Sequence, residues 1–184
     1  YVYGRNRRIM KCHCGGGYRN LSSAISNSCN SYFAMAFRKT IDKYKNASES
    51  MDIWSDHIKS FGLGEFLGND LSVGKKGNIP DGEYYDKWYP DFKWGPTTII
   101  SNAIGQGEIL VTPIQLANMT AAIANKGYYF TPHIIKSIQG ETINNKFTAK
   151  INTTIDSKYF DPVIEGMSKV YTNGTASFLK IPGI

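Results

Sequence analysis

The stretch GQGEILVTPIQLANMTAAIANKGYYFTPHII, residues 105–135, carries the clearest local signal in the chain and decides the fold prediction. Thr112 is followed three residues later by Gln115, the spacing of a capping box, in which two side chains bond free amides at a helix start. Pro113 occupies the first helical position, where its missing amide proton does no harm. The pattern predicts a helix from Pro113, with an apolar face formed by Ile114, Ala117, Ala121 and Ala124.

Apolar residues recur at helical spacing elsewhere in the chain too. They predict helices at 21–25, 30–44, 50–61 and 157–172. The apolar face of the second is expected to carry Phe33, Ala36, Phe37 and Ile41. Residues 62–98, rich in Gly, Pro, Asp and Tyr, predict a long irregular connection anchored by its aromatic side chains. The segment 128–138 favours a small extended element. Together these patterns predict a mainly α chain with a small β element.

The composition is that of a folded domain, because 41% of the 184 residues are hydrophobic and 13% are aromatic. No stretch approaches the roughly 18 consecutive apolar residues of a membrane span. The net charge of +6 includes a cluster of Arg5, Arg7, Arg8 and Lys11, but no DNA- or RNA-binding motif accompanies it. A solvated basic strand explains the cluster, so no nucleic-acid partner is expected. Both chain ends, YVYGRNRR and LKIPGI, read as cut from a longer protein.

The three cysteines, Cys12, Cys14 and Cys29, are an odd number and do not form a disulfide framework. Cys12-His13-Cys14 invites a zinc interpretation. Structural zinc sites, however, use cysteine pairs about two to four residues apart, with a matching second pair. Only Cys29, His57 and His133 remain as further ligands. We therefore expect no metal and no other cofactor.

The segment Ser26-Asn27-Ser28-Cys29-Asn30 lies directly before an apolar, helix-like run. Ser and Asn are preferred at helix starts, because their side-chain oxygens accept the free amides of the first turn. The same side chains could instead carry chemistry at an exposed position. The segment alone leaves both interpretations open.

The stretch 105–135 resembles a pattern of penicillin-binding proteins that cross-link peptidoglycan. The matching residues are Gly105, Gln106, Gly107, Val111, Thr112, Pro113, Gln115, Leu116, Ala117, Ile123, Ala124, Asn125, Gly127, Pro132 and His133. The segment NLSSAISNSCNSYFAMAF, residues 20–37, is similar to the family pattern L-x-x-A-I-x-x-S-C-N-x-Y-F, and the tail GMSKVYTNGTA, residues 166–176, is similar to a family helix followed by G-T-A. The resemblance is to class B enzymes of the elongation type. It implies the helical part of the serine β-lactamase/transpeptidase-like fold.

The family carries three motifs in chain order, S-x-x-K, S-x-N and K-[ST]-G. Ser28-Cys29-Asn30 fits the second. The resemblance implies catalytic roles for two residues: the Ser28 hydroxyl would relay a proton, and the Asn30 amide would hold a lysine and a substrate peptide group. Cys29 is expected to turn into the packing.

The other two motifs are missing from the expected places. S-x-x-K occurs at Ser72–Lys75 and at Ser177–Lys180, but both follow S-x-N, and neither context suits the helical turn that the motif needs. No K-T-G or K-S-G occurs. Residues 1–184 therefore read as the piece of a transpeptidase domain between the first and third motifs, truncated at both ends and inactive alone.

The resemblance implies a parent D,D-transpeptidase that binds the D-Ala-D-Ala end of peptidoglycan stem peptides, forms an acyl-serine intermediate and binds β-lactams. It also implies cell-wall synthesis proteins as partners, and a place on the periplasmic side of the cytoplasmic membrane with an anchor outside this chain. Two alternatives remain: a non-catalytic module that binds cell-wall peptide or a partner protein, and, more remotely, a zinc-binding module.

Overall fold

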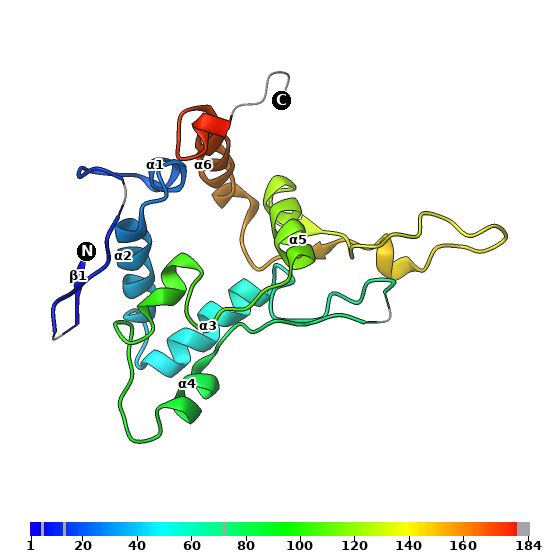
Figure 1. Cartoon of the computed structure of the whole chain (residues 1–184). Helices are drawn as coiled ribbons and strands as arrows, with labels where there is room; N and C mark the ends of the chain where they lie inside the picture. The colour runs from blue at the N-terminus through cyan, green and yellow to red at the C-terminus, as the bar shows by residue number, and fades with distance from the viewer. Residues whose placement is uncertain (5, 13, 72, 180–184) are drawn as a thin grey trace.

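The computed structural model describes residues 1–4, 6–12, 14–71 and 73–179, and it is mainly helical (Figure 1). The helices are α1 (Leu21–Ser26), α2 (Asn30–Ile41), α3 (Ala47–Lys59), α4 (Gly82–Trp88), α5 (Pro113–Ala124) and α6 (Asp161–Thr172). Short 3-10 turns are η1 (Ile100–Ile104), η2 (Asn145–Phe147), η3 (Ser157–Tyr159) and η4 (Ser177–Leu179). Strand β1 (Val2–Tyr3) pairs with β2 (Arg8–Ile9), and β3 (Tyr128–Tyr129) with β4 (Ile151–Asn152), both antiparallel. The predicted fold class is confirmed. Ser72 and Lys180, which belong to the two S-x-x-K tetrapeptides, lie outside the described residues.

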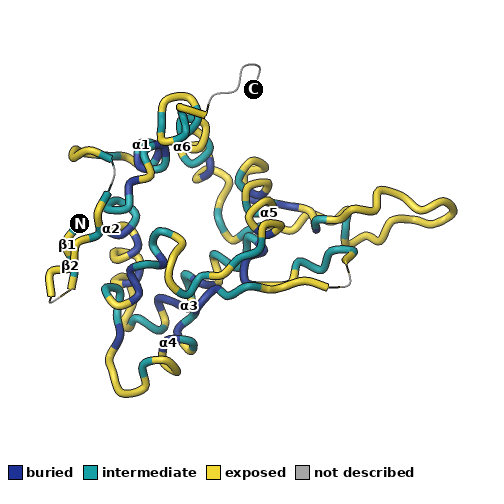
Figure 2. The backbone as a smooth tube through the Cα atoms, viewed as in Figure 1, coloured by how far each residue is buried: buried dark blue, intermediate teal, exposed yellow. Residues whose placement is uncertain are grey.

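The largest cluster of buried side chains lies where α2, α3, α4 and η1 meet, and Figure 2 shows buried segments on these elements. The Phe37 ring of α2 meets the Trp54 ring of α3 edge-on, with 5.5 Å between centroids. Phe37 and Ile41 are buried as predicted, but Ala34 is buried in place of Ala36. Helix α2 packs on η1 as well as on α3, and this second contact turns the buried stripe toward Ala34.

The segment 62–98 is not irregular throughout, because it contains α4. The Asp81 side chain accepts a hydrogen bond from the Tyr84 amide at 2.9 Å and so begins this helix. Of the expected aromatic anchors, Tyr85 and Trp94 are buried, whereas Trp88 and Phe92 are exposed. The segment is therefore anchored by Tyr85 and Trp94, with Tyr84 and Tyr89 partly buried against the same core, rather than by all of its aromatic residues.

Helix α5 begins as predicted, with a complete capping box between Thr112 and Gln115. The prediction of its buried face is wrong, because Ile114, Ala117, Ala121 and Ala124 are exposed and the buried residues are Gln115, Asn118 and Ala122. The polar side chains are buried because they bond loop carbonyls. Gln115 Nε2 donates to the carbonyls of Glu65 and Lys76, and Asn118 Nδ2 donates to that of Phe61.

Helices α1 and α6 are distant in sequence but lie side by side in space (Figure 1). Gly166 of α6 makes this close packing possible, since a Cβ there would lie 2.9 Å from Ile25 Cβ and 3.0 Å from the Ser22 carbonyl oxygen. Helix α6 begins at Asp161, after the 3-10 turn η3, rather than at residue 157. Within the described residues, no helix combines the length and the apolar character needed to cross a membrane.

Candidate active-site wall

The S-x-N residues form the connection between α1 and α2. The Ser28 amide donates to the Ile25 carbonyl at 3.0 Å, and the Cys29 amide donates to the Ala24 carbonyl at 2.9 Å. This tight reversal places Ser28 in the left-handed region, with φ of 50°. A non-glycine residue there costs about 1–3 kcal/mol, and such strain clusters at functional sites. The exposed Ser28 side chain is thus fixed at the rim of a rigid turn.

The sequence left two interpretations of residues 26–30 open, helix capping and chemistry. The structure bears on the first of them. Cys29 is the residue before α2, and its side chain makes no capping hydrogen bond to that helix. Among the described residues, the side-chain hydrogen bonds of Ser28 and Asn30 go to Thr175 and Lys11 instead. The side chains of Ser28 and Asn30 therefore have no capping duty. Asn20 and Ser23 cap α1 instead, through a capping box. Cys29 is buried, as expected.

Asn30 is the first residue of α2 and is half-buried. Its Nδ2 donates to the Lys11 carbonyl at 3.1 Å. This hydrogen bond ties the strand-like segment after β2 to the start of α2. Ser28 and Asn30 thus lie next to each other along one turn, with Ser28 more exposed to solvent than Asn30.

Thr175 lies against the same turn from the far end of the chain. Its Oγ1 is 3.1 Å from Ser28 Oγ, and its amide donates to the Ser26 carbonyl at 3.0 Å. Gly174, just before it, packs so closely that a Cβ would overlap the Ser26 carbonyl oxygen. Gly174-Thr175-Ala176 is the G-T-A segment of the family resemblance, which by itself implies no role for Thr175. Nothing local in the sequence could have indicated the contact, because 147 positions separate Ser28 from Thr175.

The side chains of the three cysteines cluster next to this turn. The sulfur atoms of Cys12, Cys14 and Cys29 lie within 4.8 Å of one another, and the Sγ atoms of Cys12 and Cys29 are 3.5 Å apart. All three are free thiols. Burial opposes ionisation of Cys12, but its hydrogen bonds with Cys14 and Cys29 outweigh this effect and lower the Cys12 pKa to about 6. Burial and the same neighbours raise the Cys14 pKa to about 11.

Three thiols could hold a thiophilic metal, but structural zinc sites use four ligands. His13 lies outside the described residues. The other two histidines lie elsewhere, since His57 Nδ1 is 2.6 Å from Thr154 Oγ1 and the His133 ring packs against Phe147. The absence of a metal therefore stays a prediction.

The segment 105–108 of the family-like stretch is held by a buried polar network. Asn102 Nδ2 donates to the Tyr85 hydroxyl at 2.6 Å, which in turn donates to Glu108 Oε2 at 2.8 Å. Burial is the main cause that raises the Tyr85 pKa, and the Glu108 carboxylate adds to it. This network fixes the loop before α5 and joins it to the core.

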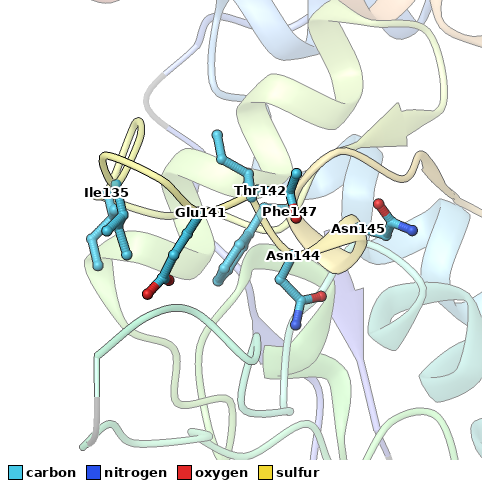
Figure 3. A pocket seen from close by; sticks show the side chains of 8 residues that line it. Ile135, Glu141, Thr142, Asn144, Asn145 and Phe147 are labelled. Atoms are coloured by element: carbon cyan, nitrogen blue, oxygen red, sulfur yellow. The ribbon is translucent and has the colours of Figure 1, made fainter.

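A separate hollow of about 610 Å³ lies on the arm formed by residues 133–150 (Figure 3). Its lining combines apolar side chains such as Ile135 and Phe147 with Glu141, Asn144 and Asn145. The lining includes neither a serine nor a lysine. The arm also projects away from α1 and α6 in Figure 1. It is therefore not part of the Ser28 site.

Comparison with known proteins identifies the family to which this chain belongs. The sequence profile described as "Penicillin binding protein transpeptidase domain" matches residues 4–184. The chain belongs to this family. The resemblance found from its motifs is thereby confirmed.

Individual relatives agree with this assignment. The peptidoglycan D,D-transpeptidase MrdA of Acinetobacter baumannii is 32% identical over 172 residues, which cover 91% of this chain and 24% of that protein. Penicillin-binding protein PBP2 of Pseudomonas aeruginosa, solved in complex with WCK 5153, matches with a TM-score of 0.71 and 29% identity, covering 90% of this chain and 34% of that one. PBP2 of Helicobacter pylori, solved in complex with MreC, matches with a TM-score of 0.68 and 29% identity, covering 89% and 28%. The chain thus spans about a quarter of the length of the curated relative.

Proposed function

We propose that this chain is part of a peptidoglycan D,D-transpeptidase, and that Ser28 and Asn30 form one wall of its acylation site. The observation that carries the proposal is the state of Ser28. Its hydroxyl is exposed, held in a left-handed turn and free of any helix-capping duty, in a chain of the transpeptidase family. Residues held in sparsely populated backbone regions cluster at functional sites, which supports a functional role for Ser28.

The proposed reaction is an acyl transfer in two steps. A serine outside residues 1–184, from an S-x-x-K motif, attacks the carbonyl carbon of the penultimate D-Ala of a stem peptide. A Ser–O–C bond forms, the C–N bond to the terminal D-Ala breaks, and that D-Ala leaves as an amine. An amine of a second stem peptide then attacks the ester, and the serine is released. β-Lactams would acylate the same serine.

Within this scheme, Ser28 moves a proton. Its hydroxyl can accept a proton from a neighbouring lysine and pass its own proton to the leaving amine nitrogen. Asn30 would orient the lysine and a peptide group of the substrate. Asn30 begins a helix that packs into the core, and Ser28 lies in the tight turn just before it, so the site wall would be rigid.

The proposal extends to the partners and the location of the full-length protein. PBP2 of H. pylori is solved in complex with MreC, and we propose cell-wall synthesis proteins as partners here. The proposed location is the periplasmic side of the cytoplasmic membrane, with an anchoring segment and the K-[ST]-G motif outside this chain.

The test is penicillin acylation of the full-length protein, measured beside its thermal unfolding. Ser28→Ala should lower the acylation rate by about 10²–10⁴-fold, the usual contribution of a general acid–base group. Its unfolding should change little, because Ser28 caps no helix and the one side-chain hydrogen bond that is lost, to Thr175, is exposed to solvent. Lys39→Ala, an exposed change on α2, is the matched control and should leave both unchanged.

Two results would contradict the proposal. If Ser28→Ala shifts unfolding but leaves acylation within about twofold of wild type, Ser28 has only a structural role. If the full-length wild-type protein forms no acyl adduct, a non-catalytic module that binds cell-wall peptide is the better interpretation.

A further inference from the structure

We infer that Thr175 is a positioning residue that orients the Ser28 hydroxyl for proton relay. The inference rests on the function proposed for Ser28. Its basis is the contact of 3.1 Å between Thr175 Oγ1 and Ser28 Oγ, which joins the segment after α6 to the turn between α1 and α2. The two hydroxyls meet at an exposed place, where stability alone does not require a hydrogen bond between side chains.

The backbone on both sides fixes where the Thr175 hydroxyl stands. The Thr175 amide donates to the Ser26 carbonyl at 3.0 Å, and the Ala176 amide donates to the Val170 carbonyl at 3.0 Å. Gly174 leaves no space between this segment and Ser26. The segment therefore cannot shift relative to the turn without breaking these contacts.

The hydrogen-bonding capacity of a hydroxyl explains why such a partner matters. A serine hydroxyl donates one hydrogen bond and accepts two. A proton relay through Ser28 uses the hydroxyl's one donor position and one of its two acceptor positions. The second acceptor position of Ser28 Oγ is then free for another hydrogen bond. Thr175 fills that position if it donates to Ser28 Oγ. The Ser28 proton then points away from Thr175, toward the site in which the leaving amine would lie.

A freely rotating Ser28 hydroxyl would point its proton in several directions, and only one is productive. Misplacement of a reacting group by about 1 Å can cost about 100-fold in rate. Removing only the Thr175 hydroxyl should therefore slow acylation without removing the relay itself. The effect should be smaller than that of Ser28→Ala.

The experiment uses the full-length protein, with penicillin acylation rates and thermal unfolding measured on each variant. Thr175→Val keeps the branched shape and removes the hydroxyl, and should slow acylation by about 10–100-fold. Thr175→Ser keeps the hydroxyl and should restore most of the rate. Thr172→Val, an exposed change one turn earlier, is the matched control and should behave as wild type.

The double variant separates positioning from general damage. In a Ser28→Ala background, Thr175→Val should have no further effect on acylation, because residues that act as a unit are not additive. Equal slowing by Thr175→Val and Thr175→Ser, or a further loss in the double variant, would overturn the inference. Should Thr175→Val fail to fold, Thr175→Ala carries the same expectations.

The outcomes also distinguish this inference from the proposed function. If Ser28→Ala leaves acylation unchanged, the function proposed for Ser28 fails, and the role of Thr175 fails with it. If Ser28→Ala slows acylation but Thr175→Val does not, only the role of Thr175 is wrong.

Discussion

The side chain of Asn30 holds the backbone of Lys11 through a hydrogen bond of 3.1 Å from Nδ2 to the carbonyl oxygen. The residue that opens α2 is therefore also the one that anchors the cysteine-bearing segment in front of it. In consequence, Asn30 has both a structural and a proposed catalytic partner. Changes at this position should affect stability and acylation together, unlike changes at Ser28.

Replacing Asn30 by Ala in the full-length protein should therefore lower both quantities. The lost hydrogen bond should cost about 1 kcal/mol of unfolding free energy, and acylation by penicillin should slow because the amide no longer orients its partners. Calorimetry and stopped-flow acylation measure the two effects. Lys39→Ala on the same helix serves as the control, and an Asn30→Ala protein with wild-type acylation would remove Asn30 from the site.

Of the two partly exposed cysteines, Cys12 should be more reactive than Cys14 near neutral pH. Its pKa is lowered to about 6, whereas that of Cys14 is raised to about 11, and only the thiolate is nucleophilic. Alkylation of Cys12 by iodoacetamide should therefore rise as the pH increases through about 6, while Cys14 stays protonated and slow up to about 11. Peptide mapping by mass spectrometry gives both rates.

A Cys14→Ala variant provides the control for this thiol prediction. Unlike Cys14→Ser, it removes the side-chain hydrogen bond that lowers the Cys12 pKa, so the alkylation midpoint of Cys12 should rise in it. Preferential labelling of Cys14 in the wild type at pH 7 would contradict the expected order of reactivity.

Zinc should not be retained at a stoichiometric level by the purified chain. The described residues gather three sulfur atoms within 4.8 Å of one another, and a structural zinc site needs four ligands. Elemental analysis after dialysis against buffer measures this directly. A tightly held equivalent of zinc, lost in a Cys29→Ser variant, would show that the cluster is a metal site after all.

The chain of residues 1–184 should not be acylated by a fluorescent penicillin. Ser177 lies in a short 3-10 turn, η4, rather than in the helical turn that an S-x-x-K motif needs. Intact-mass spectrometry of the chain after incubation is the measurement. An adduct mapped to Ser177 or to Ser72 would mean that the nucleophile is present in the chain and that the proposed placement of the motifs is wrong.

Local signals in the sequence predict local structure well. The capping box of Thr112 and Gln115 found the start of α5, because both partners lie in one turn. Helix α4 escaped prediction because it is short and its only clear signal is the Asp81 cap in an aromatic, Gly-rich segment. The Asp81 cap favours a helix start, but the residues after it show no apolar repeat at helical spacing.

Burial patterns that depend on distant loops are harder to predict. The spacing of Ile114 and Ala117 indicated an apolar buried face, yet Gln115 and Asn118 point inward because they bond carbonyls of the 61–76 segment. The candidate site is likewise only partly predictable from local sequence. Ser28 and Asn30 were found through a motif, whereas Thr175 depends on a contact that only the folded chain creates.

The positive φ of Ser28 has a consequence for which amino acids this position can accept. Threonine offers the same hydroxyl, but a β-branched residue is a genuine outlier in the left-handed region. The backbone, rather than the chemistry of the hydroxyl, would thus exclude threonine here. Ser28→Thr keeps the hydroxyl group and would nevertheless strain the turn between α1 and α2, so the main chain limits which hydroxyl-bearing residue this position accepts.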